Sequence, residues 1–257
     1  MKHILYIICI LSLAVSANAA IVSKPVEYTQ NGTTLEGYLA YDDAVQGKRP
    51  GVLVVHEWWG LNDYVRSRVD KLARLGYVAF ALDMYGKGIW TTEAAKAKDL
   101  SGHLQGTPLM RQRARAGLDI LKSNSLVDPA RIAAIGYCFG GTTVLELAYS
   151  GADLAGVVTF HGGLTAPKPD DLSRIKTRFL ICHGANDGFI SGDAINAFQE
   201  GMRKSGVDWQ MIFFGGAVHG FTNPGADKYG IKGLAYNKLA DERSWQYMQI
   251  FFKEIFS

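Results

Sequence analysis

The residues best suited to chemistry surround Cys138, in the run Gly-Tyr-Cys-Phe-Gly over residues 136–140. A glycine two positions before and two after the cysteine is the spacing of a nucleophile elbow, where a strand turns sharply into a helix. Glycines are needed there because a Cβ would clash with backbone that passes close by. Such a turn aims the sulfur over a helix N-terminus, where free amides and the helix dipole favour the thiolate. The motif alone is equally typical of a small buried cysteine beside a tight turn.

Two further residues follow later apolar runs in the order that such an elbow requires. Asp187 comes soon after a run that ends at Cys182, and His219 soon after a run that ends at Phe214. In this kind of fold the acid follows the nucleophile along the chain, and the histidine comes last. Taken alone, Asp187 is typical of turn chemistry and His219 of a solvated loop. Together with Cys138 they predict a Cys–His–Asp triad at the carboxyl ends of strands.

An acyl-transfer site also needs two backbone donors for the oxyanion. Phe139, the residue after the cysteine, is expected to supply one donor, and Trp58, in the loop after an earlier strand, the other. His56 and Glu57 begin a zinc-binding pattern, but its second histidine is replaced by glycine, so we expect neither metal nor cofactor. His161 and the two glycines after it resemble an oxyanion loop as well. Because they follow the nucleophile strand, an ordinary turn is the favoured interpretation.

The elements that must position these residues alternate along the chain. Apolar runs that we interpret as strands cover residues 51–55, 77–82, 131–137, 154–160, 178–183 and 208–214. Between them lie stretches with helical periodicity, which include 139–149, 193–204 and 236–256. This alternation predicts an α/β-hydrolase fold, a mostly parallel sheet with helices on both faces. At its edge we expect an antiparallel hairpin of residues 26–28 and 34–41 around Asn31-Gly32.

The composition is that of a globular protein, with 48% hydrophobic and 20% charged residues among 257 and a formal net charge of +3. There is no Lys/Arg cluster with interleaved aromatics and no nucleic-acid-binding motif, so a nucleic-acid partner is not expected. No repeat or linker interrupts residues 20–257, which predicts a single domain. We expect a monomer or a small homo-oligomer.

Residues 1–19 combine a short positive start, an apolar run and the small-residue site Ala17-Asn18-Ala19. This pattern predicts a signal peptide, and therefore an exported protein that is periplasmic or secreted. The alternative is a membrane anchor, but the apolar run over residues 4–15 is shorter than the roughly 20 residues that a spanning helix needs. We expect no stable membrane insertion after cleavage.

Export raises the question of a disulfide between Cys138 and Cys182. In the predicted topology one strand separates the two cysteines, which places their Cα atoms roughly 10 Å apart. A disulfide requires less than about 7 Å. Cys182 is therefore interpreted as a core residue.

Five segments resemble the dienelactone hydrolase family, in the family's order. They are Val-His-Glu-Trp-Trp-Gly at 55–60, Leu-Asp-Met-Tyr-Gly-Lys at 82–87, Gly-Tyr-Cys-Phe-Gly-Gly at 136–141, His-Gly-Ala-Asn-Asp at 183–187 and His-Gly-Phe-Thr-Asn-Pro at 219–224. The resemblance runs from about Val26 to the C-terminus. It implies a Cys–His–Asp triad that hydrolyses an enol-lactone through an acyl-enzyme. It also implies that Glu57 contacts the resting thiol and takes its proton when substrate binds.

We therefore expect an esterase or lactonase that acts on a small-molecule substrate, with Cys138 as nucleophile, His219 as base and Asp187 as its orienting acid. Where muconate-pathway members of the family carry an arginine for the substrate carboxylate, this chain has lysine, which keeps the charge but loses the bidentate fork. The residues that we expect to bind substrate are Lys87, Tyr85, Trp59 and Phe221. For the aromatic ones, ordinary packing is the alternative. Two other classes stay open: a thiol redox protein that uses Cys138, and a binding module without turnover.

Overall fold

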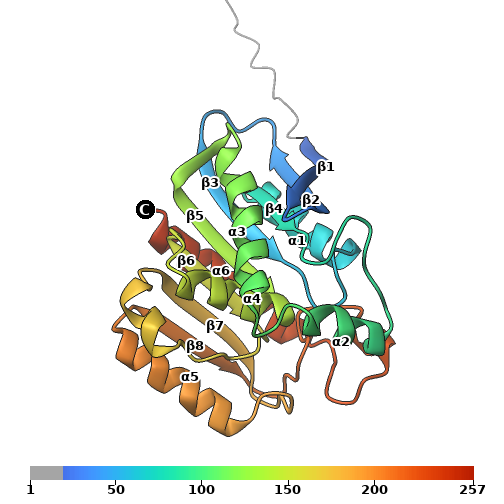
Figure 1. The fold of residues 1–257 in the computed structure, drawn as a ribbon, viewed down its shortest axis with the longest axis vertical. Helices are drawn as coiled ribbons and strands as arrows, with labels where there is room; N and C mark the ends of the chain where they lie inside the picture. The colour runs from blue at the N-terminus through green and yellow to red at the C-terminus, as the bar shows by residue number, and fades with distance from the viewer. Residues whose placement is uncertain (1–19) are drawn as a thin grey trace, which may run out of the picture.

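The computed structural model describes residues 20–257, so the signal peptide predicted over residues 1–19 lies outside the described residues. In this part of the chain, eight strands form a sheet in the order β1-β2-β4-β3-β5-β6-β7-β8 (Figure 1). Its strands are β1 (Ile21–Gln30), β2 (Thr33–Asp42), β3 (Arg49–Val55), β4 (Val78–Leu82), β5 (Val127–Tyr137), β6 (Gly156–Phe160), β7 (Arg178–Gly184) and β8 (Trp209–Phe214). The pairs β1·β2 and β2·β4 are antiparallel, and the strands from β4 to β8 are parallel. The predicted α/β-hydrolase architecture is confirmed.

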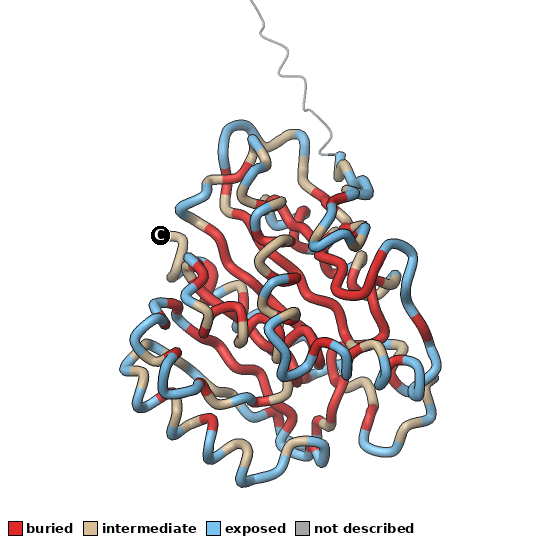
Figure 2. The backbone as a smooth tube through the Cα atoms, in the orientation of Figure 1, coloured by how far each residue is buried: buried red, intermediate tan, exposed pale blue. Residues whose placement is uncertain are grey.

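Helices cover both faces of the sheet. The elements are α1 (Asp63–Arg74), α2 (Ala94–Gly102), α3 (Pro108–Ser123), α4 (Phe139–Tyr149), α5 (Gly192–Ser205) and α6 (Lys238–Ile255), with short 3-10 helices η1 (Pro169–Arg174) and η2 (Ala226–Tyr229). Helices α3, α4 and α5 pack on one face, and α1 and α6 on the other (Figure 1). The central strands are buried along their length, whereas the helices expose their outer sides (Figure 2). Coverage on both faces explains why these strands are continuous apolar runs rather than alternating ones.

The edge hairpin is longer than the sequence pattern predicted. Asn31 and Gly32 both have positive φ, 48° and 76°, which suits the two-residue turn that joins β1 and β2. Pairing then continues from Thr33 along the full length of both strands. Pro25 is tolerated within β1 because this strand lies at the edge of the sheet. Backbone pairing therefore extends the hairpin beyond its alternating residues.

One helix was not anticipated. The Gly- and Lys-rich stretch over residues 85–108 contains α2, whose buried residues are Ala97 and Ser101. With only one apolar side chain buried, the helix has no apolar stripe that periodicity would detect. No helix within residues 20–257 is both long and apolar enough to cross a membrane.

The topology also answers the disulfide question. Strand β6 lies between β5 and β7, and both Cys138 and Cys182 are free thiols. Cys182 is 1% exposed and belongs to the core between the sheet and helices α1 and α6. The interpretation of Cys182 as a core residue is confirmed.

Candidate active site

Cys138 lies at the junction of β5 and α4 in a strained backbone conformation, with φ 53° and ψ −116°. A Cβ on Gly136 would lie 2.0 Å from the Gly140 carbonyl oxygen, and a Cβ on Gly140 would lie 2.2 Å from the Val55 carbonyl oxygen. Backbone contacts this close admit only glycine, as the motif predicted. The Cys138 N–H donates to the Phe160 carbonyl at 3.1 Å, which ties the elbow to the end of β6.

His219 and Asp187 come together from the loops after β8 and β7. His219 Nδ1 lies 2.8 Å from Asp187 Oδ2, and both side chains are buried. The other Asp187 oxygen accepts the N–H of Phe189 at 3.0 Å. A carboxylate held in this way fixes the proton on Nδ1 of the imidazole and leaves Nε2 as its basic atom.

Opposing effects set the charge of His219. Burial lowers its pKa, but the charge and hydrogen bonding of Cys138 and Asp187 outweigh burial and raise the pKa to about 10. The surroundings of His219 therefore favour its imidazolium form.

Glu57 follows β3 and is 3% exposed. Burial raises its pKa to about 7, although the hydrogen bond from Asn223 and the charges of His219 and Arg68 act in the opposite direction. A carboxyl group with this pKa exchanges its proton near neutral pH.

The hydrogen-bond partner of Glu57 differs from expectation. Its Oε2 accepts a hydrogen bond from Asn223 Nδ2 at 2.6 Å, and within residues 20–257 no hydrogen bond joins it to Cys138. Sequence reasoning missed Asn223 as a site residue. The available signal was its place in the family-like segment 219–224.

The two expected oxyanion donors lie on segments in contact with each other. A Cβ on Gly140 would lie 2.6 Å from the His56 carbonyl oxygen, and the His56 ring stacks on Phe139 with centroids 6.0 Å apart. Phe139 is the first residue of α4, so its N–H has no acceptor within the helix. In the described part of the chain, the Trp58 N–H donates to no backbone carbonyl. The Tyr85 hydroxyl donates to the Trp58 carbonyl at 2.9 Å and fixes this loop.

His56 has a structural explanation that needs no metal. Its Nδ1 lies 2.5 Å from the Glu57 carbonyl oxygen, and its Nε2 accepts the Met84 N–H at 3.2 Å. Burial lowers its pKa, so the ring is neutral and both nitrogens have partners. Among residues 20–257, no three His, Cys, Asp or Glu side chains are grouped to hold a metal ion.

Three of the expected substrate-binding residues have other partners. The Lys87 ammonium pairs with Glu27 on the edge strand β1. Phe221 is fully buried in the core below the site. Trp59 is 1% exposed and stacks on Tyr229 with centroids 3.9 Å apart. Surface ion pairing and core packing therefore account for these side chains, and the structure does not bring them to the triad.

Two aromatic side chains do lie at the triad. Tyr85 is buried beside Phe139, with centroids 5.7 Å apart, and its pKa is raised by burial and by the charge of Cys138. Phe189 is 52% exposed, and its ring meets the His219 ring edge to face at 5.2 Å. Sequence reasoning missed Phe189 because a single aromatic residue in a loop has no periodic pattern.

Two cavities are lined by neighbours of the site residues, and neither is lined by Cys138, Asp187 or His219 themselves. One, of about 480 Å³, is lined by Asn223, the partner of Glu57, and by Tyr64 and Trp90. The other, of about 550 Å³, is lined by Thr142, which lies one helical turn after Cys138. Cavities of this size accommodate small-molecule ligands.

Comparisons with known proteins agree with this fold. Residues 35–256 match the profile of the Dienelactone hydrolase family. Protein usf of Aquifex pyrophilus is 28% identical over 238 residues, which cover 91% of this chain and 99% of that protein. A solved dienelactone hydrolase-like promiscuous phosphotriesterase from metagenomic libraries is 42% identical with a TM-score of 0.89, over 92% of this chain and 99% of its own. A solved protein named m3DLH is 45% identical with a TM-score of 0.90, over 93% and 100%. The chain belongs to the dienelactone hydrolase family and is a carboxylic ester hydrolase.

Proposed function

We propose that this protein hydrolyses a small carboxylic ester or lactone through a thioester on Cys138. The observation that supports the proposal most is the 2.8 Å contact between His219 and Asp187 beside a cysteine in a strained strand-to-helix turn. Each of the three residues follows the carboxyl end of a parallel strand, where α/β sheets bind their ligands.

In the acylation step, the Cys138 thiolate attacks the carbonyl carbon of the substrate. The N–H groups of Trp58 and Phe139 donate hydrogen bonds to the oxyanion of the tetrahedral intermediate. The intermediate then collapses, the bond to the alcohol oxygen breaks, and the His219 imidazolium donates a proton to the leaving alcohol. A thioester and a neutral imidazole remain.

In the deacylation step, His219 Nε2 removes a proton from water, and the resulting hydroxide attacks the thioester. Cys138 leaves as a thiolate, which restores the thiolate–imidazolium pair. Asp187 holds the tautomer of the imidazole throughout. We propose that the sulfur is a thiol before substrate enters, that Glu57 then accepts its proton to form the thiolate–imidazolium pair, and that Glu57 returns the proton to the sulfur after the product leaves. The Glu57 pKa of about 7 suits this transfer.

The proposal is tested with a panel of p-nitrophenyl esters and lactones on the wild-type protein, Cys138→Ala and Cys182→Ala. Turnover is expected to vanish in Cys138→Ala and to persist in Cys182→Ala, because Cys182 is a core residue. Mass spectrometry after mixing with a slow ester is expected to find one acyl group on Cys138. Unchanged turnover in Cys138→Ala would remove the cysteine from the mechanism. Peroxide consumption without ester turnover would favour a thiol redox protein instead.

A second candidate activity is the hydrolysis of phosphotriesters. It is favoured by the 42% identity to a relative that is named a promiscuous phosphotriesterase. The same thiolate would attack phosphorus and displace an aryloxide. A p-nitrophenyl phosphotriester in the same panel tests this activity, which must also disappear in Cys138→Ala.

We also propose that the protein is exported, on the basis of residues 1–19. Cell fractionation followed by N-terminal sequencing tests this proposal. A mature protein that starts at Ala20 is expected outside the cytoplasm, and an uncleaved cytoplasmic protein would contradict the proposal.

A further inference from the structure

His161 is a buried side chain that the proposed mechanism does not use. It directly follows β6, is 0% exposed and has a φ of 42°. Among the described residues its Nδ1 has no hydrogen-bond partner. A strained backbone and an unsatisfied buried polar atom both cost free energy, and such features cluster at functional sites.

The turn that carries His161 contacts both halves of the triad. The ring of His161 meets the ring of His219 edge to face, with centroids 5.3 Å apart. The residue before it, Phe160, accepts the N–H of Cys138 at 3.1 Å. The His161 N–H donates to the Cys182 carbonyl at 2.9 Å, which anchors the turn on β7. A change in His161 therefore acts at the base without touching substrate.

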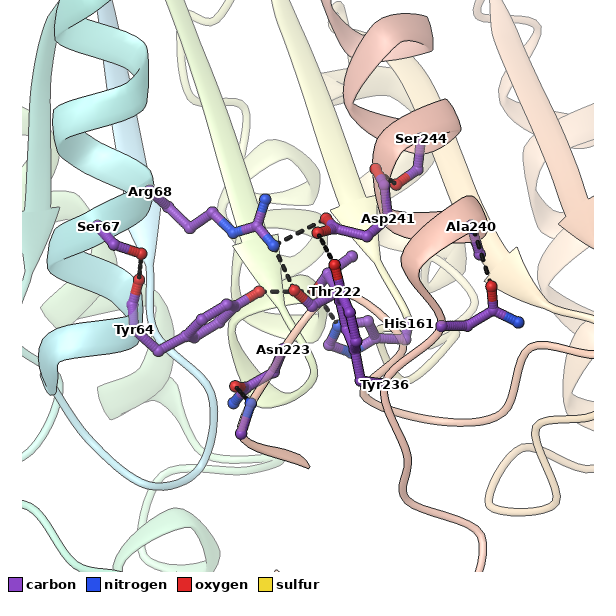
Figure 3. A network of polar contacts seen from close by, with 12 residues as sticks. Tyr64, Ser67, Arg68, His161, Thr222, Asn223, Tyr236, Ala240, Asp241 and Ser244 are labelled. Atoms are coloured by element: carbon purple, nitrogen blue, oxygen red, sulfur yellow. Dashed lines mark hydrogen bonds and ion pairs between the residues drawn. The ribbon is translucent and has the colours of Figure 1, made fainter. Parts of the chain in front are cut away.

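A hydrogen-bonded chain holds the ring of His161 (Figure 3). Its Nε2 lies 2.7 Å from Thr222 Oγ1, which in turn lies 2.6 Å from the Tyr64 hydroxyl. Burial raises the pKa of Tyr64 well above its usual range, so the phenol in this chain keeps its proton. Burial also lowers the pKa of His161 well below its usual value.

Thr222 is itself held by a buried arginine. Arg68 Nη2, from α1, donates to the Thr222 carbonyl and to Asp241 Oδ1 on α6, the latter at 2.8 Å. Figure 3 shows Arg68 and Asp241 converging on Thr222 from these two helices. The chain from Arg68 to His161 is thus anchored on rigid elements.

We propose that His161 is a positioning residue for His219. Its neutral ring, held through Thr222, fixes the imidazole of His219 in the orientation that proton transfer requires and adds no positive charge beside it. The inference rests on the proposed function of the triad. Misplacement of a catalytic group by about 1 Å can cost on the order of 100-fold in rate.

Two variants separate the contributions of the ring and of the hydrogen bond. His161→Asn tolerates a positive φ but lacks the ring, and His161→Phe keeps a ring but loses the hydrogen bond between Nε2 and Thr222. We expect each to lower kcat by about 10-fold or more, with KM changed by less than about twofold, because the ring acts on the base and not on substrate. We also expect the pH midpoint of Cys138 alkylation by iodoacetamide to rise in both, because a displaced imidazolium stabilises the thiolate less.

The titratable groups that act on His219 are Cys138, Asp187, Glu57, His161 and His183. Thr177 supplies the matched control, since it is also buried, also has a side-chain oxygen without a hydrogen-bond partner among the described residues, and precedes β7 at the end of the sheet opposite Cys138. Thr177→Ala is expected to lower the melting temperature while kcat and the alkylation profile stay unchanged.

Lower stability in the His161 variants without a change in kcat or in the alkylation profile would overturn the proposal. If these variants do not fold, Thr222→Val carries the test, because it removes only the hydroxyl that holds His161, and a smaller change in the same direction is expected. Failure of the proposed function is distinguishable, because Cys138→Ala would then retain turnover.

Discussion

His219 and Glu57 have raised pKa values for different reasons. The His219 pKa is raised because the effects of Cys138 and Asp187 outweigh its burial, whereas Glu57 is held toward its neutral form because burial outweighs its favourable contacts. The Glu57 pKa of about 7 suits proton exchange near neutral pH. Each of the two shifted pKa values leads to a measurable prediction.

The first prediction concerns His219 in the Cys138→Ala variant. Removing the sulfur takes away one of the two groups that raise the imidazole pKa, while burial continues to lower it. The His219 pKa is therefore expected to fall from about 10 toward its ordinary value. An NMR titration of the ring protons measures the change, and an unchanged pKa would mean that the sulfur does not act on the ring.

The second prediction concerns the pH dependence of stability in Glu57→Gln. The folded-state pKa of about 7 lies above the ordinary 4.5, so the contribution of Glu57 to stability is full below 4.5 and is lost as the pH rises through 7. At pH 8 the glutamine variant is expected to be more stable than wild type by at most about 3 kcal/mol. The advantage should disappear near pH 4.5.

Urea unfolding at pH 5, 6, 7 and 8 measures this difference. Glutamine keeps an oxygen that can accept the hydrogen bond from Asn223, so packing changes little. A stability difference that is the same at every pH would contradict the assigned cause.

At the scale of elements, the junction of β5 and α4 positions Cys138, the proposed nucleophile. Gly140→Ala would place a Cβ 2.2 Å from the Val55 carbonyl oxygen, and backbone on a central strand cannot move aside cheaply. We expect a loss of stability and a loss of turnover larger than 10-fold, roughly, because the elbow must shift. Gly215→Ala is the control, since no heavy atom lies within 4 Å of its added Cβ. Thermal melts and ester turnover measure both variants, and wild-type behaviour in Gly140→Ala would contradict the steric role of this glycine.

Periodicity predicted the elements that have a strong apolar pattern. The sequence-based bounds of α4 match the structure, and strands β3 to β8 were placed to within a few residues, because burial on both faces gives each an uninterrupted apolar run. Helix α2 was missed because it buries one apolar residue, Ala97. The β1–β2 hairpin was underestimated because strand pairing needs backbone groups and not a particular side-chain pattern.

The residues of the candidate site also include some that the sequence pattern predicted and some that it missed. The places of Cys138, Asp187 and His219 after the carboxyl ends of strands were predictable, because their order along the chain follows the order of the strands. Asn223 and His161 were not predicted as site residues, because each meets its partner only in the folded chain. Asn223 donates a hydrogen bond to Glu57, and the ring of His161 contacts the ring of His219. Contacts between residues far apart in sequence leave no local pattern.

At the scale of the whole molecule, Arg68 connects helices α1 and α6, which share one face of the sheet, to the loop that carries His219. It is 2% exposed, and its guanidinium joins α1 to Asp241 on α6 and to the carbonyl of Thr222 in the base loop. It also lies over the rings of Tyr64 and Trp245, at 5.1 and 5.6 Å from their centroids. The packing of the two helices and the position of the His219 loop therefore depend on one buried charge.

Arg68→Met removes that charge and leaves the Asp241 carboxylate buried, with the Tyr236 hydroxyl at 3.2 Å as its remaining side-chain partner among the described residues. Breaking a buried ion pair on one side typically costs about 3–5 kcal/mol, and we expect a loss of that size in the unfolding free energy. Adding Asp241→Asn is expected to recover part of the stability, because the uncompensated charge is gone, but not the turnover, because Thr222 still lacks its donor. Arg66→Met on the same helix is the control, since its partner Asp63 is exposed and surface pairs contribute little. If turnover returned together with stability in the double variant, the arginine would act on the fold alone and not on the base loop.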